Sequence, residues 1–330
     1  TSRPFLRHRE FLWQEGHTLH ATPEEAIAET EQQLETYANL CENILAMPVI
    51  RGQKTDKEKF AGAERTYTIE CMMHDRKALQ AGTSHYFGDG FPTAFDITFT
   101  DQNNQQTHPF ETSWGLSTRI IGGIIMTHGD NNGLVLPPRI APIQVIILPI
   151  AAHKPGVTEA AEQLVERLKN QGLRAKGDFS DNSPGWKFAE YEMKGVPLRI
   201  EIGPKDLEKN QCVAVRRDNG EKIVLSLTEL ETKVPELLDQ VHNGLYEKAA
   251  KNIADHTYAA YSLEEAKQLQ EEHGGFIKTM WCGNLQCELD MKEKAGMTSR
   301  CIPFQQEHLG DVCPICGKPA KHMVVWGVAY

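Results

Sequence analysis

Hydrophobic positions recur at helical spacing in two stretches of the first half of the chain. Residues 22–47 open with Thr-Pro-Glu-Glu, in which a threonine cap, a proline at the first position and a glutamate three residues after the cap indicate a helix start. Residues 114–128 predict a second helix, whose buried stripe would be formed by Leu116, Ile120, Ile121, Ile124 and Ile125. We interpret the first helix as scaffold and assign it no chemistry.

Shorter patterns predict further elements. Alternating apolar and charged residues near the end of 3–11 predict a strand, and the charged run within 49–65 is typical of a solvated loop. We also expect a helix over 66–73, strands over 77–84 and 96–99, and a polar turn over 101–107.

Strands and helices alternate after Pro137-Pro138. The pattern predicts strands over 144–150, 173–175 and 198–202, helices over 157–169 and 186–193, and a hairpin over 212–227 that turns at Asp218-Asn219-Gly220. This alternation indicates a small α/β domain with a mixed sheet. Two further helices are expected over 234–252 and 263–272.

Composition places the chain among ordinary globular proteins. Its 330 residues exceed what one core usually serves, so two or three domains are expected. The apolar runs are too short for a bilayer and no secretory signal opens the chain, which favours a cytoplasmic protein without membrane partners. A formal charge of −10 argues against nonspecific wrapping of nucleic acid but permits local RNA contact.

Cysteines are concentrated near the end of the chain, where five of the eight lie in the last 49 residues. Without a secretory signal, this clustering favours metal binding in a reducing compartment over disulfides. The spacing of Cys282, Cys287, Cys313 and Cys316 predicts a closed structural Zn²⁺ site, with free thiols as the alternative. Cys301 is the spare, interpreted as a packed thiol.

Arg119 and His128 are unusual members of the apolar helix predicted over 114–128. A buried unpaired cation costs several kcal/mol, so Arg119 must either join a core salt bridge or reach a cleft, and both alternatives stay open here. Gly115, Gly122 and Gly123 each weaken a helix by about 1 kcal/mol relative to alanine. Their presence suggests that another backbone or a ligand approaches closely.

Three short sequences carry a resemblance to a known family. They are Arg-Glu-Phe-Leu-Trp-Gln-Glu-Gly-His at 9–17, Leu-Gln-Ala-Gly-Thr-Ser-His at 79–85 and Ser-Trp-Gly-Leu-Ser-Thr-Arg at 113–119. Together they make the chain similar to prolyl-tRNA synthetase, a class II aminoacyl-tRNA synthetase, over nearly its whole length. On this resemblance, residues 3–20 are the second half of motif 2 and Arg119 is the motif 3 arginine.

The resemblance implies a multidomain protein that combines α/β and α+β architecture. Residues 1–140 would be the C-terminal part of an antiparallel-sheet catalytic domain, 141–240 an α/β anticodon-binding domain with a mixed sheet, and 241–330 a small zinc-binding domain. Only 111 residues separate Arg7 from Arg119. This leaves no room for the editing insertion of the bacterial-type branch, so the chain resembles the archaeal and eukaryotic type.

The resemblance also assigns roles to individual residues. Proline would be activated by ATP to prolyl-adenylate and transferred to tRNA(Pro), with Arg7 and Arg119 on the phosphates and Phe11 stacked on adenine. Further contacts to ATP are implied for His8, Gln80, Thr83 and Ser117, with Gln80 also helping to place Mg²⁺. Trp13, Phe60 and His85 would shape the proline pocket. Candidate anticodon contacts are Lys194, Arg199, Glu201, Lys205, Arg216 and Arg217.

Motif 1, the first half of motif 2 and the dimer contacts of the family are expected upstream of Thr1, so the full-length enzyme is expected to be a homodimer and these 330 residues alone to be inactive. The C-terminal carboxylate is expected near the catalytic domain, where a fused tag could interfere with catalysis. Two alternative functions are a noncatalytic tRNA-binding or regulatory relative and a zinc-dependent structural protein. The first has no use for an intact ATP site, and the second explains only the cysteine-rich tail.

Overall fold

The computed structural model describes residues 3–330, which form two compact units. The first comprises residues 3–42, 47–127 and 250–330, and the second comprises 43–46 and 128–249. The sequence-based division at residues 140 and 240 stays a prediction. In the structure, the beginning and the end of the chain belong to one compact unit.

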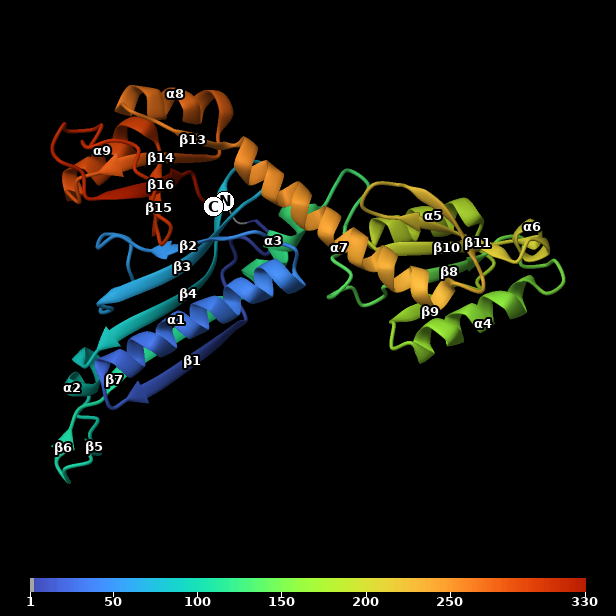
Figure 1. Ribbon diagram of the computed structural model, residues 1–330, viewed down its shortest axis with the longest axis horizontal. Helices are drawn as coiled ribbons and strands as arrows, with labels where there is room; N and C mark the ends of the chain where they lie inside the picture. Colours follow the sequence, from blue (N-terminus) through green and yellow to red (C-terminus); the bar gives the residue numbers. More distant parts are fainter. Residues whose placement is uncertain (1–2) are drawn as a thin grey trace. The chain divides into compact units, whose positions relative to one another are not determined.

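The first unit is built on a nine-stranded sheet with the order β1-β7-β4-β3-β2-β15-β16-β14-β13 (Figure 1). Neighbouring strands are antiparallel except for β13 and β14. The early strands are β1 (Trp13–His20), β2 (Ile50–Gln53), β3 (Arg65–Met72), β4 (Ala78–Gly88) and β7 (Phe110–Ser117). The late strands are β13 (Thr257–Ala259), β14 (Phe276–Trp281), β15 (Thr298–Pro303) and β16 (His322–Gly327).

Helix α1 (Pro23–Asn39) covers one face of the early strands. Thr22 caps it as predicted, because its side chain accepts a hydrogen bond from the backbone N–H of Glu25 at 3.2 Å. The helix continues as a π-helical turn, Leu40–Ile44. The other short elements of this unit are α2 (Gly90–Ala94), α3 (Arg119–His128), α8 (Leu263–His273), α9 (Leu285–Ala295) and the ribbon of β5 (Phe99–Thr100) and β6 (Gln106–Thr107).

The second unit confirms the predicted mixed sheet, with the order β12-β11-β10-β8-β9. Its strands are β8 (Val145–Pro149), β9 (Ala175–Gly177), β10 (Leu198–Ile202), β11 (Gln211–Arg216) and β12 (Lys222–Ser226), of which β8 pairs in parallel with β9 and β10. Its helices are α4 (Val157–Asn170), α5 (Pro184–Met193), α6 (Pro204–Glu208) and the long α7 (Leu230–Asp255), whose last turns belong to the first unit.

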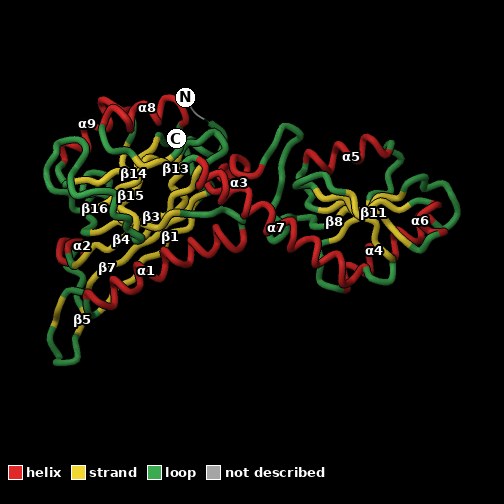
Figure 2. The backbone as a smooth tube through the Cα atoms, turned by 45° about the horizontal axis from the view of Figure 1, so that its top comes forward, coloured by secondary structure: helices red, strands yellow, loops and turns green. Residues whose placement is uncertain are grey.

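Both faces of the five-stranded sheet are covered, because side chains alternate along β8. Val145 and Ile147 pack into a core with α4 and α7, whereas Ile146 and Leu148 pack against Tyr191 of α5. Figure 2 shows α4 and α5 on opposite sides of this sheet. The apolar run that predicted a buried strand therefore serves two cores at once.

Two predicted helices are partly or wholly strands. Residues 66–73 were expected to be helical, but β3 occupies most of this stretch and is buried along seven of its eight residues. A strand buried on both faces loses the alternation that would distinguish it from a buried helix. The helix expected over 114–128 begins only at Arg119, because the preceding Ser-Trp-Gly-Leu-Ser continues β7, where Gly115 pairs with Glu15 of β1.

Two predicted strands are shorter or absent. Residues 3–11 contain a single bridge between Arg3 and Arg7, since Pro4 and the left-handed backbone of Phe5 (φ 59°) turn the chain. The strand expected over 96–99 is reduced to β5.

The close approach expected at the glycines of α3 is made by side chains. A Cβ on Gly122 would lie 2.8 Å from Leu6.

The loop expected to be solvated over 49–65 contains two buried polar residues, Lys54 and Thr55. The Lys54 ammonium donates to Glu70 and to the carbonyl of Arg300, both at 2.7 Å, and the Arg300 guanidinium lies 3.0 Å from Glu70. Burial alone would raise the pKa of Glu70, but these two cations lower it. Lys54 therefore belongs to an internal ion cluster that ties the end of β2 to β3 and β15.

His128 is a structural residue of the second unit. Its Nε2 donates to the Leu45 carbonyl at 2.9 Å, and burial lowers the pKa of the ring to about 4. Because protonation is easier in the unfolded chain, where histidine titrates near 6.5, this contribution to stability is full above about pH 6.5 and is lost as the pH falls toward 4. The loss amounts to roughly 3 kcal/mol.

We expect His128→Gln to flatten this pH dependence, since the glutamine amide can donate to Leu45 but does not titrate. The measurement is the free energy of unfolding in urea at pH 7 and pH 4.5. His242, whose pKa burial also lowers, is present in both proteins, and its charge contributes to the lowered pKa of His128. Equal losses on acidification in the two proteins would contradict this role.

Candidate active site

A cavity of about 450 Å³ lies over β1, β4 and β7, on the face opposite to α1. Alternation along the strands creates this division. Gln14 bonds to Tyr37 of α1, whereas its neighbours Trp13 and Glu15 line the cavity. On β7, Thr112 meets Thr30 of α1 at 3.0 Å. The cavity contains the sequence-predicted residues Trp13, Phe60, Gln80, Thr83, His85, Ser117 and Arg119.

A β-bulge brings Gln80 to the same face as Thr83 and His85. In a regular strand Gln80 would point away from these two residues, because successive side chains alternate. The register shifts here, so that Ile69 pairs with Gly82 but Glu70 pairs with Gln80. The extra residue, Ala81, reverses the alternation, and bulges often re-aim side chains in this way beside functional sites.

His85 forms one wall of the cavity together with Phe60. The two ring centroids lie 5.1 Å apart, and His85 Nδ1 is 3.0 Å from the hydroxyl of Thr66. Burial lowers the pKa of His85 to about 4, so the ring is neutral near pH 7. Trp13 stays 70% exposed and Phe60 53% exposed at the cavity. The two rings therefore offer apolar faces to a small ligand.

Arg119 opens helix α3 at the other end of the cavity. Its Nε donates to the Leu6 carbonyl at 3.0 Å, and its guanidinium lies 4.7 Å from the centre of the Phe11 ring. Burial, and then the positive charge of Arg7, lower the pKa of Arg119. Neither arginine forms an ion pair with a carboxylate in residues 3–330. Of the two alternatives for Arg119, the structure supports the cleft over the core salt bridge.

Three predicted residues lie beside the cavity but do not line it. These are Arg7, His8 and Phe11, of which His8 and Phe11 have ring centroids 5.6 Å apart. Among the lining residues that were not predicted are four with titratable side chains: Glu15, His17, Glu58 and Glu111. His17 contacts Glu15 at 3.1 Å and Glu111 at 3.4 Å. Glu15 and His17 could have been identified from the sequence, because they alternate with Trp13 along one strand and therefore share its face.

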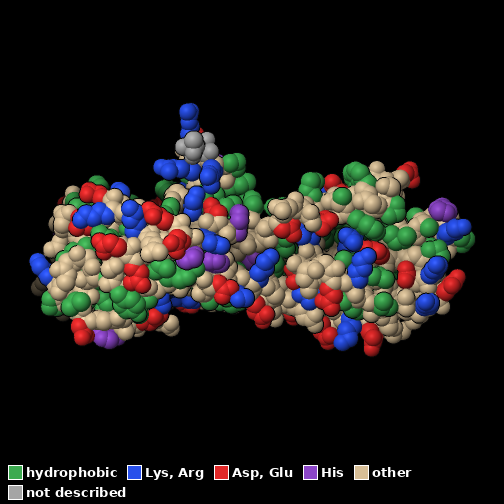
Figure 3. Space-filling model, turned by 90° about the horizontal axis from the view of Figure 1, so that it is seen from above, with side chains coloured by type: hydrophobic (Ala, Val, Ile, Leu, Met, Phe, Trp, Pro, Cys, Tyr) green, Lys and Arg blue, Asp and Glu red, His purple; other side chains and the backbone are tan. Residues whose placement is uncertain are grey.

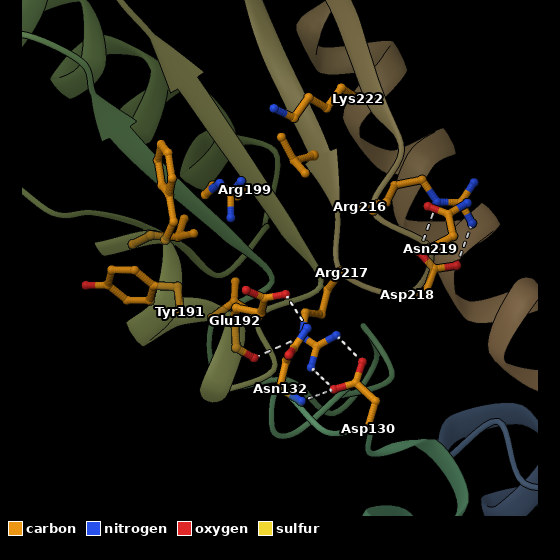
Figure 4. A pocket seen from close by; sticks show the side chains of 15 residues that line it. Asp130, Asn132, Tyr191, Glu192, Arg199, Arg216, Arg217, Asp218, Asn219 and Lys222 are labelled. Carbon is orange, nitrogen blue, oxygen red and sulfur yellow. Dashed lines mark hydrogen bonds and ion pairs between the residues drawn. The ribbon is translucent and has the colours of Figure 1, made fainter. Parts of the chain in front are cut away.

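A second cavity, of about 570 Å³, lies in the second unit and is lined by Arg199, Arg216 and Arg217 (Figure 4). Arg217 donates two hydrogen bonds to Asp130 at 2.7 and 2.6 Å and one to the Glu192 carbonyl. The hydrogen bonds from Arg217 to Asp130 are the main reason that the pKa of Asp130 is lowered to about 2. Arg216 is tied to Asp218 at 2.7 and 3.0 Å. These two guanidinium groups are thus held by carboxylates within the protein.

The two remaining cations of this cavity differ in their contacts. Arg199 lies 4.2 Å over the ring of Phe188 and donates to Glu201 at 2.9 Å. Lys222 has no hydrogen bond or ion pair from its amino group to any described residue, and it was missed by the sequence reasoning. Three predicted candidates, Lys194, Glu201 and Lys205, are not among the lining residues.

The four predicted cysteines come together beside α9. The sulfur atoms of Cys282, Cys287, Cys313 and Cys316 all lie within 4.8 Å of one another. Those of Cys282 and Cys287 are 3.7 Å apart, and those of Cys282 and Cys316 are 3.6 Å apart. Tetrahedral Zn²⁺ with Zn–S bonds of 2.3 Å requires sulfur separations of about 3.8 Å, so this cluster fits a metal ion. Cys301 is fully buried outside it, as predicted.

On the face of the described residues that Figure 3 shows, lysine and arginine side chains are interspersed with aspartate and glutamate. Within residues 3–330, every helix is too short or too polar to traverse a lipid bilayer.

Comparison with known proteins defines the class first. Residues 1–128 match the tRNA synthetase class II core domain (G, H, P, S and T), and residues 144–237 match an anticodon binding domain. The chain is thus built as a class II aminoacyl-tRNA synthetase. Residues 263–330 match the C-terminal domain of prolyl-tRNA synthetase. The chain belongs to the prolyl-tRNA synthetase family, which confirms the predicted fold class and family.

Individual relatives agree with this assignment. The chain is 61% identical over all its residues to a proline–tRNA ligase of Clostridium novyi (strain NT) and 58% identical to proline–tRNA ligase 2 of Bacillus thuringiensis (strain Al Hakam), spanning 69% of each. A crystal structure of prolyl-tRNA synthetase from Cryptosporidium parvum, complexed with L-proline and AMP, is 39% identical. It matches 99% of this chain and 70% of its own, with a TM-score of 0.95.

Proposed function

We propose that this chain carries out proline activation and tRNA recognition in a proline–tRNA ligase. The observation that carries the proposal is the cavity in which Trp13, Phe60 and His85 meet Gln80, Thr83 and Arg119. An apolar end suits a small imino acid and a cationic end suits phosphate. The similarity to a synthetase complexed with L-proline and AMP supports both halves.

At the phosphate end, we assign Arg119 and Arg7 to the triphosphate. Two nearby guanidinium groups repel each other, and an anion between or beside them relieves that repulsion. Phe11 would stack on adenine, and His8, Thr83 and Ser117 would contact the nucleotide. The Gln80 amide oxygen would help hold Mg²⁺, which when bound offsets the charge of the phosphates.

At the amino-acid end, Trp13 and Phe60 would enclose the pyrrolidine ring, and the neutral His85 would close the wall between them. The proline carboxylate attacks the α-phosphorus of ATP, an oxygen–phosphorus bond forms, and pyrophosphate leaves. The terminal adenosine of tRNA(Pro) then takes the prolyl group. No protein nucleophile is required, so catalysis rests on alignment and on the cations.

In the second unit, the cavity of Figure 4 is our candidate for a flipped-out anticodon base. Arg199 on Phe188 provides a stacking surface, and Lys222 is a free cation for a phosphate. Arg216, Arg217 and Glu201 would shape the cavity, whereas Lys194 and Lys205 would contact the RNA outside it. The four cysteines would hold a structural Zn²⁺. We place the enzyme in the cytoplasm as a homodimer.

A pair of variants tests the two halves of this proposal. Trp13→Ala should raise the KM for proline by about tenfold or more in ATP–pyrophosphate exchange, because it removes one wall, while binding of tRNA(Pro) stays unchanged. Arg199→Ala should do the reverse, weakening tRNA binding while proline-dependent exchange is retained. Both variants should be made and measured in the full-length enzyme.

A noncatalytic relative would bind tRNA without proline-dependent exchange. If both variants changed both readouts equally, the assignment of separate sites would be wrong. Phe188→Leu is the matched variant for the second cavity, since it keeps an apolar residue beneath Arg199 but removes the ring, and we expect weakened tRNA binding there as well.

A further inference from the structure

The loop between β2 and β3 carries two residues of the active-site cavity and starts in a buried polar anchor. Glu58 and Phe60 reach the cavity, whereas Thr55, only a few residues earlier, is 2% exposed. The backbone carbonyl of Thr55 accepts hydrogen bonds from the N–H groups of Glu58 and Lys59 at 3.1 and 2.9 Å. The position of Thr55 therefore sets where this turn begins.

The side chain of Thr55 is hydrogen-bonded to a residue next to the cysteine cluster. Its hydroxyl donates to the carboxylate of Glu288 at 2.8 Å, and Glu288 directly follows Cys287 on α9. Glu288 is 2% exposed and also accepts from the hydroxyl of Ser299. A buried polar contact of this kind is geometrically demanding, because breaking it leaves unpaired groups without water.

The later part of the loop, at Phe60, is hydrogen-bonded to the wall of the cavity. The N–H of Phe60 donates to the hydroxyl of Thr66 at 3.0 Å, and the same hydroxyl lies 3.0 Å from His85. The backbone N–H of Lys54 donates to the Thr66 carbonyl at 2.8 Å, which closes the base of the loop. Hydrogen bonds and backbone thus run without a gap from Cys287 through Glu288, Thr55 and Phe60 to His85.

We propose that Thr55 and Glu288 are positioning residues that couple the cysteine-bound metal to the proline end of the active site. Neither side chain lines the cavity, so neither acts on substrate directly. Cys287 would fix the start of α9 when the four cysteines hold a metal, Glu288 holds Thr55, and Thr55 sets the turn that presents Phe60 beside His85. This inference rests on the proposed function, since it takes the cavity to be the proline site.

The decisive variant is Thr55→Val, which keeps the shape of the side chain and removes its hydroxyl. In the zinc-loaded, full-length enzyme we expect the Kd for proline, measured by calorimetry, to rise roughly tenfold, which is the effect of losing one buried hydrogen bond. The KM for ATP should change less than about twofold, since Arg119 and Gln80 do not belong to this loop. Thr55→Ser should restore proline binding.

Two controls separate positioning from general destabilisation. Ser299→Ala removes the other hydroxyl on the same buried carboxylate, which also lies 3.2 Å from the Thr55 hydroxyl, but it leaves the bond from Thr55 to Glu288. Proline affinity should therefore fall clearly less than in Thr55→Val. Glu288→Gln keeps an acceptor oxygen, so its affinity for proline should be closer to that of the unchanged protein than the affinity of Glu288→Ala. All variants should retain one zinc per chain.

Removing the metal provides a second test of the coupling. Chelation should weaken proline binding and speed hydrogen exchange at residues 55–60 in the unchanged protein, with a much smaller effect on proline binding in Thr55→Val, where the link is already broken. If the unchanged enzyme failed to bind proline at all, the proposed function would be wrong. If it bound proline and Thr55→Val bound it equally well, the coupling would be refuted and the proposed function would stand.

Discussion

Replacing Arg119 by alanine in the full-length enzyme should lower proline-dependent ATP–pyrophosphate exchange by about 10²- to 10³-fold. Loss of one preorganised charged donor from a phosphoryl-transfer site has effects of this size, because the charge that develops on the phosphates is no longer offset. The guanidinium is half-buried at the cavity and has no carboxylate partner among the described residues, so it is available to a ligand. Exchange kinetics at saturating proline give the measurement.

Binding of tRNA(Pro) should remain largely intact in Arg119→Ala, because the residues matching an anticodon binding domain belong to the other unit. Ile121→Ala on the same helix is the matched control, since Ile121 is 41% exposed and lies outside the cavity lining. Arg119→Lys keeps the charge but loses the flat face over Phe11, and we expect intermediate activity. Near-normal exchange in Arg119→Ala would remove the basis for the catalytic assignment.

The second large effect is expected at the cysteine cluster. Cys282→Ser should reduce bound zinc from one per chain to a small fraction of that, and the segment from α8 to β16 should become sensitive to protease. Structural zinc sites contribute apparent free energies of order 10 kcal/mol, because the unfolded chain offers no preformed site. Elemental analysis and limited proteolysis measure the two outcomes.

Cys301→Ala is the control for that experiment. Cys301 is also fully buried in the same part of the chain, so its loss perturbs packing without removing a metal ligand. We expect zinc to be retained at one per chain. Equal zinc content in Cys282→Ser and Cys301→Ala would contradict the four-thiolate site.

Most of the residues that the resemblance assigned to proline and ATP line one cavity, but the sequence could not explain how that cavity is assembled. The motif at 79–85 placed Gln80, Thr83 and His85 in one cleft on the strength of a resemblance, although regular alternation would have separated Gln80 from the other two. The bulge at Ala81 resolves this, and it depends on the register of β3, which no local pattern encodes. Glu58 and Glu111 were missed because one lies in the loop between β2 and β3 and the other on β7, and these segments meet at the cavity only in the folded chain.

Local errors had a similar origin. The strand at β3 was taken for a helix because burial on both faces erased its alternation. Lys54 was taken for a surface charge because its partners, Glu70 and Arg300, are distant in sequence. In contrast, the elements of the second unit, such as β10 and α4, follow from periodicity and turn residues that lie close together along the chain.

Pairing of β2 with β15 has a consequence for synthesis on the ribosome. Ile302 and Pro303 pair with Gln53 and Gly52, so an early strand waits for partners that are translated about 250 residues later. Until then the nascent polypeptide presents an open edge at β2, which is prone to pairing with other chains. A message truncated before the codon for Thr298 would therefore yield a product with this edge exposed, suited to capture by chaperones or proteases.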